Sequence, residues 1–471
     1  MIRTLRSEGG GFQAILPIAR EAPEGVNWIT VFIAENGGRK SFLLRCLTEA
    51  ALGNSRYASQ RNSKVTFARP IELPERVIAI SGTPLDRFPR AGTRDLRSKR
   101  KAGIYEDNFV YLGQRASNGM SGLAQSERSL VGSLLSNRHR LKERGDQLAR
   151  VFGHLGLEPT ISVKLRVSNS KDPLAKLSEG DFLNNILNNL KSNRVESPES
   201  KELLLAVDQL NSESNLNTIY SSLNSIEGGR KVLTIGPQRT VPRFGLSVAM
   251  WELLLRAGVV ELLSTEFVRA RRNSNEIISG DQLSSGQWNW LGSFGALVSE
   301  LRDNCLILVD EPENSLHPSW QRAFMSELYD SISYFKNCQV VVATHSPLIA
   351  SGVSPAWGNI RTLKRAQRIN AVVRSEPLAT AFGWNATDVY DELFGLESTR
   401  DPEFLALADT ALNRISKNGA IPIEDVENWV SSLRSAASTL PSFDPMREIF
   451  LDIVATLLKR SVLPRKGKVA P

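Results

Sequence analysis

The stretch that most constrains this chain runs from Leu306 to Pro318 and reads LILVDEPENSLHP. It begins with four consecutive apolar residues, Leu306 to Val309, a pattern typical of a strand that is buried on both faces of a parallel sheet. Two adjacent carboxylates, Asp310 and Glu311, follow this run directly. In open α/β sheets, ligands bind at the carboxyl ends of the strands. The alternative is a core strand that ends in an acidic turn, and the rest of the chain decides between the two.

A second apolar run and a histidine follow these carboxylates at the distance of one helix. Pro318 is favoured at the first position of a helix, and the residues after it have helical spacing. The next apolar run, Gln339 to Ala343, ends shortly before His345. Such a βαβ unit has parallel strands joined by a right-handed crossover. We therefore expect His345 at the same sheet edge as Asp310 and Glu311.

A glycine-rich turn near the N-terminus has the context of a phosphate-binding loop. The segment Asn27 to Ile33 predicts a strand, Phe42 to Leu52 has helical spacing, and Ala34 to Ser41 (AENGGRKS) lies between them. The backbone N–H groups of such a turn form a nest for phosphate oxygens, and the helix N-terminus adds a positive dipole end. In this arrangement Lys40 reaches the β- and γ-phosphates and the Ser41 hydroxyl ligates Mg²⁺.

Two positions of this loop depart from the GxxxxGK[ST] pattern. Ala34 holds the first glycine position, and Arg39 holds the glycine position before the lysine. Glycine at these places lets the backbone approach phosphate and adopt unusual dihedral angles. Arg39 either accepts a less favourable backbone or donates its guanidinium to the nucleotide. An ordinary strand–helix turn that contains glycine is the simpler alternative.

Two further segments indicate a function only when they are taken together with the motifs above. The segment Leu283 to Gln287 (LSSGQ) precedes residues with helical spacing, and a small-residue turn that opens a helix is an anion site. A simple serine N-cap is the alternative there. Gln114 follows the predicted strand Asn108 to Leu112, a placement that carries no message by itself.

Composition narrows the class of protein. The chain has 471 residues, of which 41% are hydrophobic and 23% charged, which suits a globular protein of two or three domains. Three cysteines, an odd number, argue against a disulfide framework and favour a reducing compartment. We find no signal peptide and no membrane span, so we expect a cytoplasmic protein with no membrane partner. The net charge of +8 permits contact with nucleic acid. Basic residues are concentrated at Arg87–Lys101 and at Arg269, Arg271 and Arg272, although such runs are more often solvated loops.

Taken in chain order, these motifs resemble those of the ABC-type ATPase heads. The ENSLHP segment is similar to that of the soluble SMC, RecF, OLD and AAA_21 branch, which includes ATPase components of bacterial anti-phage defence systems such as Septu. The resemblance covers about Asn27–Gln114 and Lys231–Ile360. It implies an α/β fold, an ABC-type P-loop ATPase head with a mixed, mainly parallel sheet. We divide the chain into an N-terminal head part (1–125), a helical insertion (126–230), a C-terminal head part (231–377) and a helical C-terminal region with a basic tail (378–471).

The resemblance also implies ATP and Mg²⁺ as cofactors and a role for each motif residue. Glu311 is expected to polarise the attacking water, and His345 to contact the γ-phosphate and that water. The implied phosphate contacts are Asn36, Gly37, Gly38, Arg39, Lys40 and Ser41. The implied metal ligands are Ser41, Gln114 and Asp310. The resemblance implies that a partner subunit's nucleotide has its γ-phosphate capped by Ser284, Ser285 and Gly286. It also implies that the dimer interface contains Ser315 to His317.

These expectations lead to one main hypothesis and several alternatives. The main hypothesis is an ATPase that dimerises around two ATP molecules and controls a separate effector, a nuclease or toxin, or the engagement of nucleic acid, in anti-phage defence. The sequence has no evident second active site. One alternative is a nucleotide-binding scaffold that hydrolyses little or nothing, motivated by Ala34 and Arg39. The others are a DNA-repair-type head and, more weakly, the nucleotide-binding subunit of a membrane transporter.

Overall fold

The computed structural model describes most of the chain in two compact units, Met1–Phe394 and Gly395–Pro471. The described residues are 1–8, 12–35, 37–52, 64–67, 73–89, 108–115, 123–169, 172–177, 183–184, 187, 197–210, 213–270, 276–365, 372–396, 398–416 and 421–462. The predicted phosphate contact Asn36, the basic residues Arg271 and Arg272, and the basic C-terminal tail lie outside this part of the chain.

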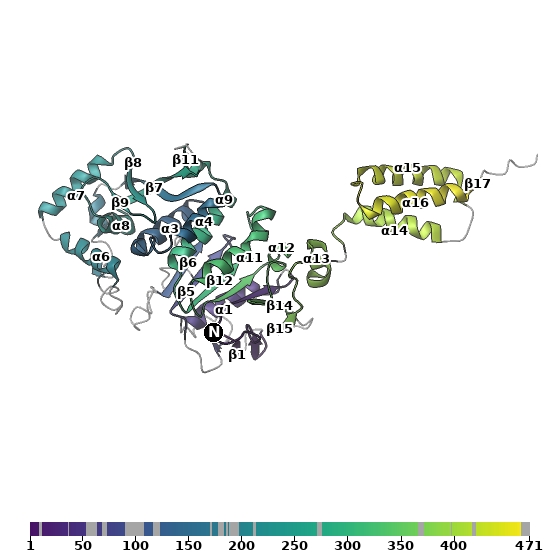
Figure 1. The fold of residues 1–471 in the computed structure, drawn as a ribbon, viewed down its shortest axis with the longest axis horizontal. Helices are drawn as coiled ribbons and strands as arrows, with labels where there is room; N and C mark the ends of the chain where they lie inside the picture. The colour runs from purple at the N-terminus through teal and green to yellow at the C-terminus, as the bar shows by residue number, and fades with distance from the viewer. Residues whose placement is uncertain are drawn as a thin grey trace, which may run out of the picture. The chain divides into compact units, whose positions relative to one another are not determined.

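Seven strands form the central sheet of the larger unit. They are β3 (Trp28–Ile33), β5 (Arg76–Ser81), β6 (Phe109–Gly113), β12 (Cys305–Asp310), β13 (Gln339–Ala343), β14 (Gly358–Arg365) and β15 (Val373–Leu378). Their order is β15-β14-β3-β13-β12-β5-β6 (Figure 1). Neighbouring strands are parallel except β14 and β15, which confirms the predicted α/β fold with a mixed, mainly parallel sheet.

The sheet is buried on both faces, as its apolar runs predict. Alternate residues of β12 belong to two separate cores, because successive side chains of a strand point to opposite faces. Leu306 and Leu308 pack with α1 (Lys40–Ala51) and with the small antiparallel sheet of β1 (Thr4–Glu8), β2 (Ile15–Pro17) and β4 (Lys64–Phe67). Ile307 and Val309 pack with α3 (Leu123–Ser136), α10 (Ala296–Glu300) and α11 (Pro318–Ser333).

The helix after LSSGQ is built in three parts. It begins as α9 (Ser285–Trp290), continues as one π-helical turn at Leu291–Gly295, and ends as α10. Side chains before and after the π turn are almost fully buried, among them Trp290 and Leu297. A single π turn inside an α-helix is uncommon and is frequent at functional sites.

The larger unit contains a second sheet. The segment Lys231 to Gly236, at the start of the expected C-terminal head part, forms β8 (Arg230–Ile235) in this separate antiparallel sheet and not in the central sheet. The order there is β11-β10-β7-β8-β9, with bounds β7 (Leu157–Val167), β9 (Val241–Pro242), β10 (Val260–Arg269) and β11 (Ile277–Ser279). The helix α8 (Val248–Ala257) ends before β10, because Gly258 adopts φ 74° and closes it.

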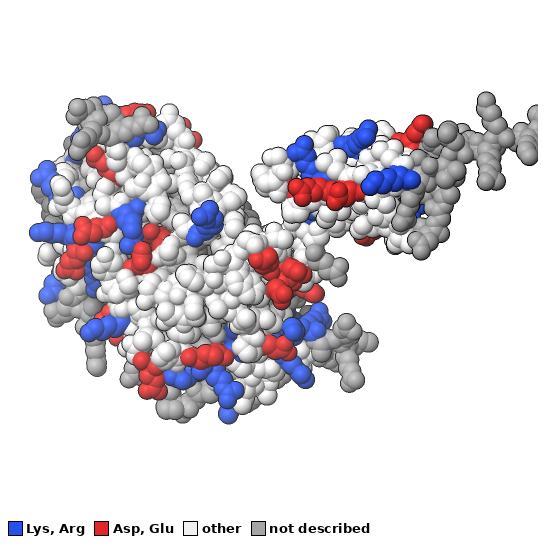
Figure 2. Space-filling model, turned by 45° about the vertical axis from the view of Figure 1, so that its right-hand side comes forward, with Lys and Arg blue, Asp and Glu red and all other residues white. Residues whose placement is uncertain are grey.

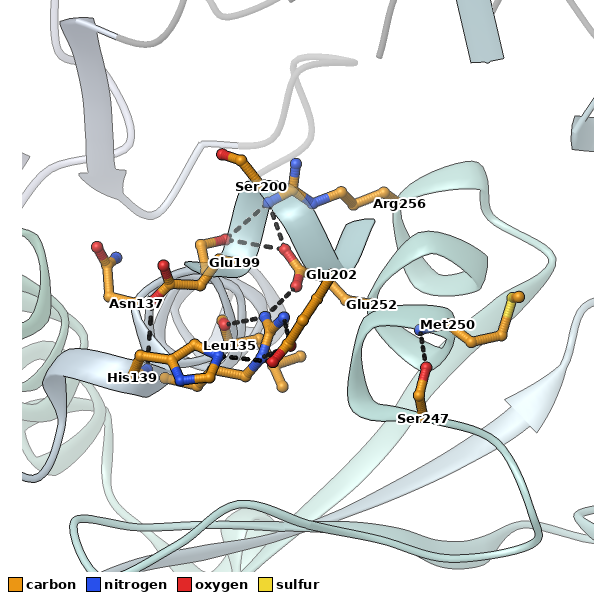
Figure 3. Close-up of polar contacts among 12 residues, drawn as sticks. Leu135, Asn137, His139, Glu199, Ser200, Glu202, Ser247, Met250, Glu252 and Arg256 are labelled. Carbon is orange, nitrogen blue, oxygen red and sulfur yellow. Dashed lines mark hydrogen bonds and ion pairs between the residues drawn. The ribbon is translucent and has the colours of Figure 1, made fainter. Parts of the chain in front are cut away.

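Ion pairs link the helices around this second sheet, and the pair of Arg138 with Glu252 is buried. Arg138 pairs with Glu202 of α6 (Pro198–Gln209) and donates to Glu252 of α8 at 2.7 Å. Arg256 also binds Glu252, at 2.5 Å (Figure 3). Two acceptors around one buried guanidinium satisfy its charge, which a buried arginine requires. The remaining helices here are α4 (Gly145–Gly153) and α7 (Glu213–Ser225).

The larger unit also contains α12 (Pro347–Ala350), and it ends with α13 (Ala386–Phe394). The smaller unit contains α14 (Pro402–Ser416), α15 (Ile423–Thr439) and α16 (Pro445–Arg460), in the region that the sequence predicted to be helical. Two short strands, β16 (Ile421–Pro422) and β17 (Ser461–Val462), pair beside them. None of the helices in the described ranges is long and apolar enough to cross a bilayer.

Charged side chains are mixed rather than segregated on the face of the larger unit that Figure 2 shows. Lys and Arg alternate with Asp and Glu around a broad uncharged area. Much of the excess positive charge of the sequence falls in segments outside the described residues, among them Arg90–Lys101 and Arg465–Lys468. The predicted contact with nucleic acid through these segments therefore stays a prediction.

Candidate functional site

One edge of the central sheet collects predicted residues from four distant parts of the chain. Asp310 is in register with Ala343 of β13 on one side and with Ser81 of β5 on the other. Ser81 is in register with Gly113, so Gln114 emerges two strands away at the same edge. The backbone N–H of Glu311 donates to the Ala343 carbonyl at 2.9 Å. Parallel pairing thus brings the carboxyl ends of these strands together, as the sequence predicted.

Asp310 is buried, with 1% of its surface exposed, and lies against the phosphate loop. The Ser41 hydroxyl donates to Asp310 Oδ1 at 3.0 Å, whereas Oδ2 is buried and has no hydrogen-bond partner in the described part of the chain. Burial raises the pKa of the Asp310 carboxyl to about 7; the Ser41 hydrogen bond opposes this rise, and the Glu311 charge adds to it. An orphaned carboxylate oxygen beside a serine hydroxyl is a set of hard oxygen donors, which fits Mg²⁺.

Lys40 lies at the first position of α1 and reaches across to β13. Its Nζ donates to the Ala34 carbonyl at 3.1 Å and lies 2.6 Å from His345 Nε2. Burial lowers the pKa of Lys40 to about 8, and the charges of Glu311, Glu313 and Asp310 oppose that fall. Burial also lowers the pKa of His345, and the Lys40 charge acts in the same direction. A neutral His345 ring can therefore accept a hydrogen bond from the lysine.

The phosphate loop has two tight points. An added Cβ at Gly38 would lie 2.5 Å from the Ala34 side chain and 2.9 Å from the Glu35 carbonyl, so only glycine fits there. Arg39, the N-cap residue of α1, adopts φ 65° and ψ 24°, a left-handed conformation that favours glycine. The arginine therefore occupies the backbone conformation that a glycine at this position of the consensus would adopt easily.

Glu311 is held by the loop that follows it. Its φ is 47°, which is rare outside glycine, and the side-chain amide of Asn314 donates to its Oε2 at 3.0 Å. Residues in such strained conformations persist only where the surroundings fix them, and they cluster at functional sites.

Glu313 is a residue that our sequence reasoning missed. One carboxylate oxygen accepts the His345 backbone N–H at 2.5 Å, and the other accepts the Thr344 hydroxyl at 2.8 Å. Burial raises the pKa of Glu313, and these hydrogen bonds oppose the rise. The signal was present in the sequence as a third carboxylate shortly after Asp310 and Glu311, but nothing in the sequence indicated its partner.

The segment Ser284–Gly286 lies at the start of α9. Ser284 is the N-cap, with a capping box in which its Oγ accepts the Gln287 N–H at 3.3 Å and Gln287 Oε1 accepts the Ser284 N–H at 2.8 Å. The predicted contact of this segment with a nucleotide stays a prediction. Gly286 lies against the Ser315 carbonyl, only 2.5 Å from where a Cβ would be. The structure thus places this segment beside the loop after the carboxylates of its own chain.

The middle of the chain matches a known protein family. Residues 162–351 match the AAA_21 family, described as "AAA domain, putative AbiEii toxin, Type IV TA system". This range contains Ser284–Gly286, Asp310, Glu311 and His345, whereas the Lys40 loop lies before it.

Curated relatives match parts of the chain. Protein ea59 of Escherichia phage lambda is 33% identical over 120 residues, 25% of this chain and 22% of that protein. The "Retron Vc95 probable ATPase" of Vibrio cholerae serotype O1 biovar El Tor is 25% identical over 241 residues, 50% of this chain and 40% of that protein. The chain thus aligns with less than half the length of either relative. The alignment with a solved SMC head domain from Thermotoga maritima covers 80% of this chain and 99% of that domain. The sequence identity of 11% and the TM-score of 0.34 are too low to support an inference about function.

Proposed function

We propose that this chain binds ATP with Mg²⁺ and hydrolyses it. The premise is the match of residues 162–351 to the AAA_21 family of ABC-type ATPase domains. The observation that carries the proposal is the convergence of Lys40, Asp310, Glu311 and His345 at one sheet edge, with Ser41 bonded to Asp310. Lysine, serine, two carboxylates and histidine from segments some 270 residues apart in sequence meet where a phosphate-binding loop begins a helix.

Each residue has a task that its surroundings support. Lys40 exchanges its bonds to the Ala34 carbonyl and the His345 ring for phosphate oxygens, and the α1 N-terminus adds its dipole to that charge. Ser41 and Asp310, with Gln114 at the same edge, would hold Mg²⁺, which supplies neutralising charge to the phosphates when bound. Glu311 orients the attacking water, and His345, anchored by Glu313, lies where it can contact the γ-phosphate.

Measurement of phosphate release from three proteins tests the proposal. Glu311→Gln removes the carboxylate that polarises water, and we expect it to lower kcat about 100-fold or more while ATP still binds. Lys40→Ala removes charge from the phosphate site, and we expect it to lose ATP binding as well. Equal background release from the wild type and both variants would overturn hydrolysis.

A nucleotide-binding scaffold is the second candidate, and the left-handed Arg39 is the observation that favours it. A phosphate loop with a strained non-glycine residue can bind nucleotide without positioning it for attack. This candidate predicts ATP binding by the wild type, loss of binding in Lys40→Ala and no release above background. Calorimetry beside the release assay separates the two functions.

Dimerisation around ATP extends the proposal. Gly286 packs on Ser315 of its own chain, and the start of α9 carries the positive end of the helix dipole, which a nucleotide held by a second subunit can meet. We expect Glu311→Gln to form a dimer with ATP and Mg²⁺ and to remain a monomer without them, as measured by light scattering. A monomer under both conditions would contradict the ATP sandwich.

Control of a separate effector in anti-phage defence is the broadest part of the proposal. It is supported by the names of similar proteins, a retron ATPase and a family whose description includes the AbiEii toxin. Purification from native cells should recover a nuclease or toxin with the chain. For nucleic acid, a binding constant that does not change with salt would exclude contact with the phosphate backbone.

A further inference from the structure

The loop between β12 and α11 contains two residues in strained backbone conformations. Glu311 has φ 47° and Ser315 has φ 66°, both in the left-handed region. Each such conformation costs of order 1–3 kcal/mol and persists only when surrounding contacts fix it. The elements that supply these contacts therefore control where the Glu311 carboxylate lies.

Two glycines, one after β5 and one in α9, lie in close contact with the backbone of this loop. A Cβ at Gly82, just after β5, would lie 2.1 Å from the Glu311 carbonyl oxygen, and the Gly82 N–H donates to the Asp310 carbonyl at 3.0 Å. A Cβ at Gly286, in α9, would lie 2.5 Å from the Ser315 carbonyl oxygen. The loop is thus in direct backbone contact with a sheet strand at one end and with α9 at the other.

A chain of side-chain amides continues from α9 to the carboxylate. Asn289 lies three residues after Gly286, so both face the same side of the helix. Its Nδ2 donates to the Asn314 carbonyl at 2.8 Å, and the Asn314 Nδ2 donates to Glu311 Oε2 at 3.0 Å. Asn289 is only 6% exposed, so this hydrogen bond is shielded from water. Two consecutive bonds therefore join the helix after LSSGQ to the carboxylate of the same chain.

We propose that Asn289 is a positioning residue that fixes Glu311 through Asn314 and so couples α9 to hydrolysis in its own subunit. The inference rests on the proposed function, in which the start of α9 meets the nucleotide of a partner subunit. Movement of α9 toward or away from that nucleotide displaces the Asn314 carbonyl and with it the Asn314 amide that holds Glu311. Occupancy of one site thereby adjusts the carboxylate of the other.

The test compares Asn289→Asp with a matched control, Asn137→Asp. Asn137 is also a buried asparagine, 2% exposed, whose Nδ2 donates to a backbone carbonyl, that of Ser133 at 2.9 Å, in the region that Figure 3 shows. Each substitution keeps the size of the side chain and removes one amide donor. Asn289→Ala and Asn137→Ala form a second pair, should an added buried carboxylate prevent folding.

The first readout is backbone amide exchange in the nucleotide-free protein. The N–H groups of Glu311, Asn314 and Leu316 donate to the carbonyls of Ala343, Glu311 and Glu313, respectively, and report on the loop directly. We expect the Asn289 variants to speed exchange of these amides about three- to tenfold, which corresponds to the loss of one hydrogen bond. The Asn137 variants should leave them unchanged. Unchanged exchange in the Asn289 variants, or an equal effect of both pairs, would overturn the proposal.

The second readout is steady-state hydrolysis. We expect the Asn289 variants to lower kcat about 10- to 100-fold through displacement of Glu311, with the KM for ATP changed less than about threefold. A purely structural role would move stability in both pairs and kcat in neither. If the wild type itself releases no phosphate above Lys40→Ala, the proposed hydrolysis fails, and amide exchange alone still decides whether Asn289 holds the loop.

Discussion

The two halves of the site use left-handed residues in different ways. At the carboxylate edge, Glu311 and Ser315 are fixed by contacts from β5, β13 and α9, elements far apart in the sequence. In the phosphate loop, Arg39 takes the same kind of backbone conformation within a short turn, next to a glycine that presses on Ala34. The comparison teaches that the carboxylate edge is held by tertiary structure, whereas the loop at Arg39 carries a local departure from the GxxxxGK[ST] pattern.

The largest expected effect concerns the buried carboxylate that belongs to both halves. The pKa of Asp310 is raised to about 7, so its contribution to stability is greatest at low pH and is lost as the pH rises through the folded value. From about pH 5 to about pH 8 the nucleotide-free wild type should lose about 2–3 kcal/mol through this group. Asp310→Asn should keep that stability, as measured by denaturant unfolding without Mg²⁺. The same stability difference between the two proteins at both pH values would contradict the prediction.

A smaller effect is expected from the anchor of the histidine. Glu313→Gln leaves one acceptor oxygen for two donors, the Thr344 hydroxyl and the His345 N–H, so the ring beside Lys40 loses its fixed position. We expect kcat to fall about tenfold with little change in ATP affinity. Glu327→Gln is the control, because the Glu327 carboxylate also accepts hydrogen bonds, from Arg150 and His154, and lies in another part of the unit. Equal losses in the two variants would point to general destabilisation.

The smallest effect tests the local strain of the phosphate loop. Arg39→Gly removes a left-handed non-glycine residue, and we expect the free energy of unfolding to rise by about 0.5–1 kcal/mol with ATP affinity unchanged or higher. Ser315→Gly gives the same relief of φ at the carboxylate edge and serves as the control. If calorimetry shows weaker ATP binding only in Arg39→Gly, the guanidinium contacts the nucleotide and the arginine has a role beyond its backbone.

The sequence predicted those features that depend on local patterns. Apolar runs of parallel strands gave β3, β12 and β13, and a proline at the first helical position gave α11. Because parallel strands end at one edge, the meeting of Asp310, Glu311 and His345 followed from strand order alone.

Features that depend on partners distant in sequence escaped prediction. Glu313, Asn314 and Asn289 matter through hydrogen bonds between residues that are 25 to 32 positions apart, and a single sequence does not indicate such pairs. The apolar residues of β8 indicate a strand, but they do not identify its neighbours. The second sheet was missed for that reason.

The π-helical turn at Leu291–Gly295 sets the rotational phase of the helix that carries LSSGQ. Such a turn accommodates one residue more than regular α-helix does, so it rotates everything before it relative to everything after it by about 100°. With α10 fixed in the core by Leu297 and Val298, a helix shorter by that one residue would turn Gly286 and Asn289 away from the Ser315 loop. The geometric alignment of α9 with the loop after Asp310 thus depends on a single inserted residue.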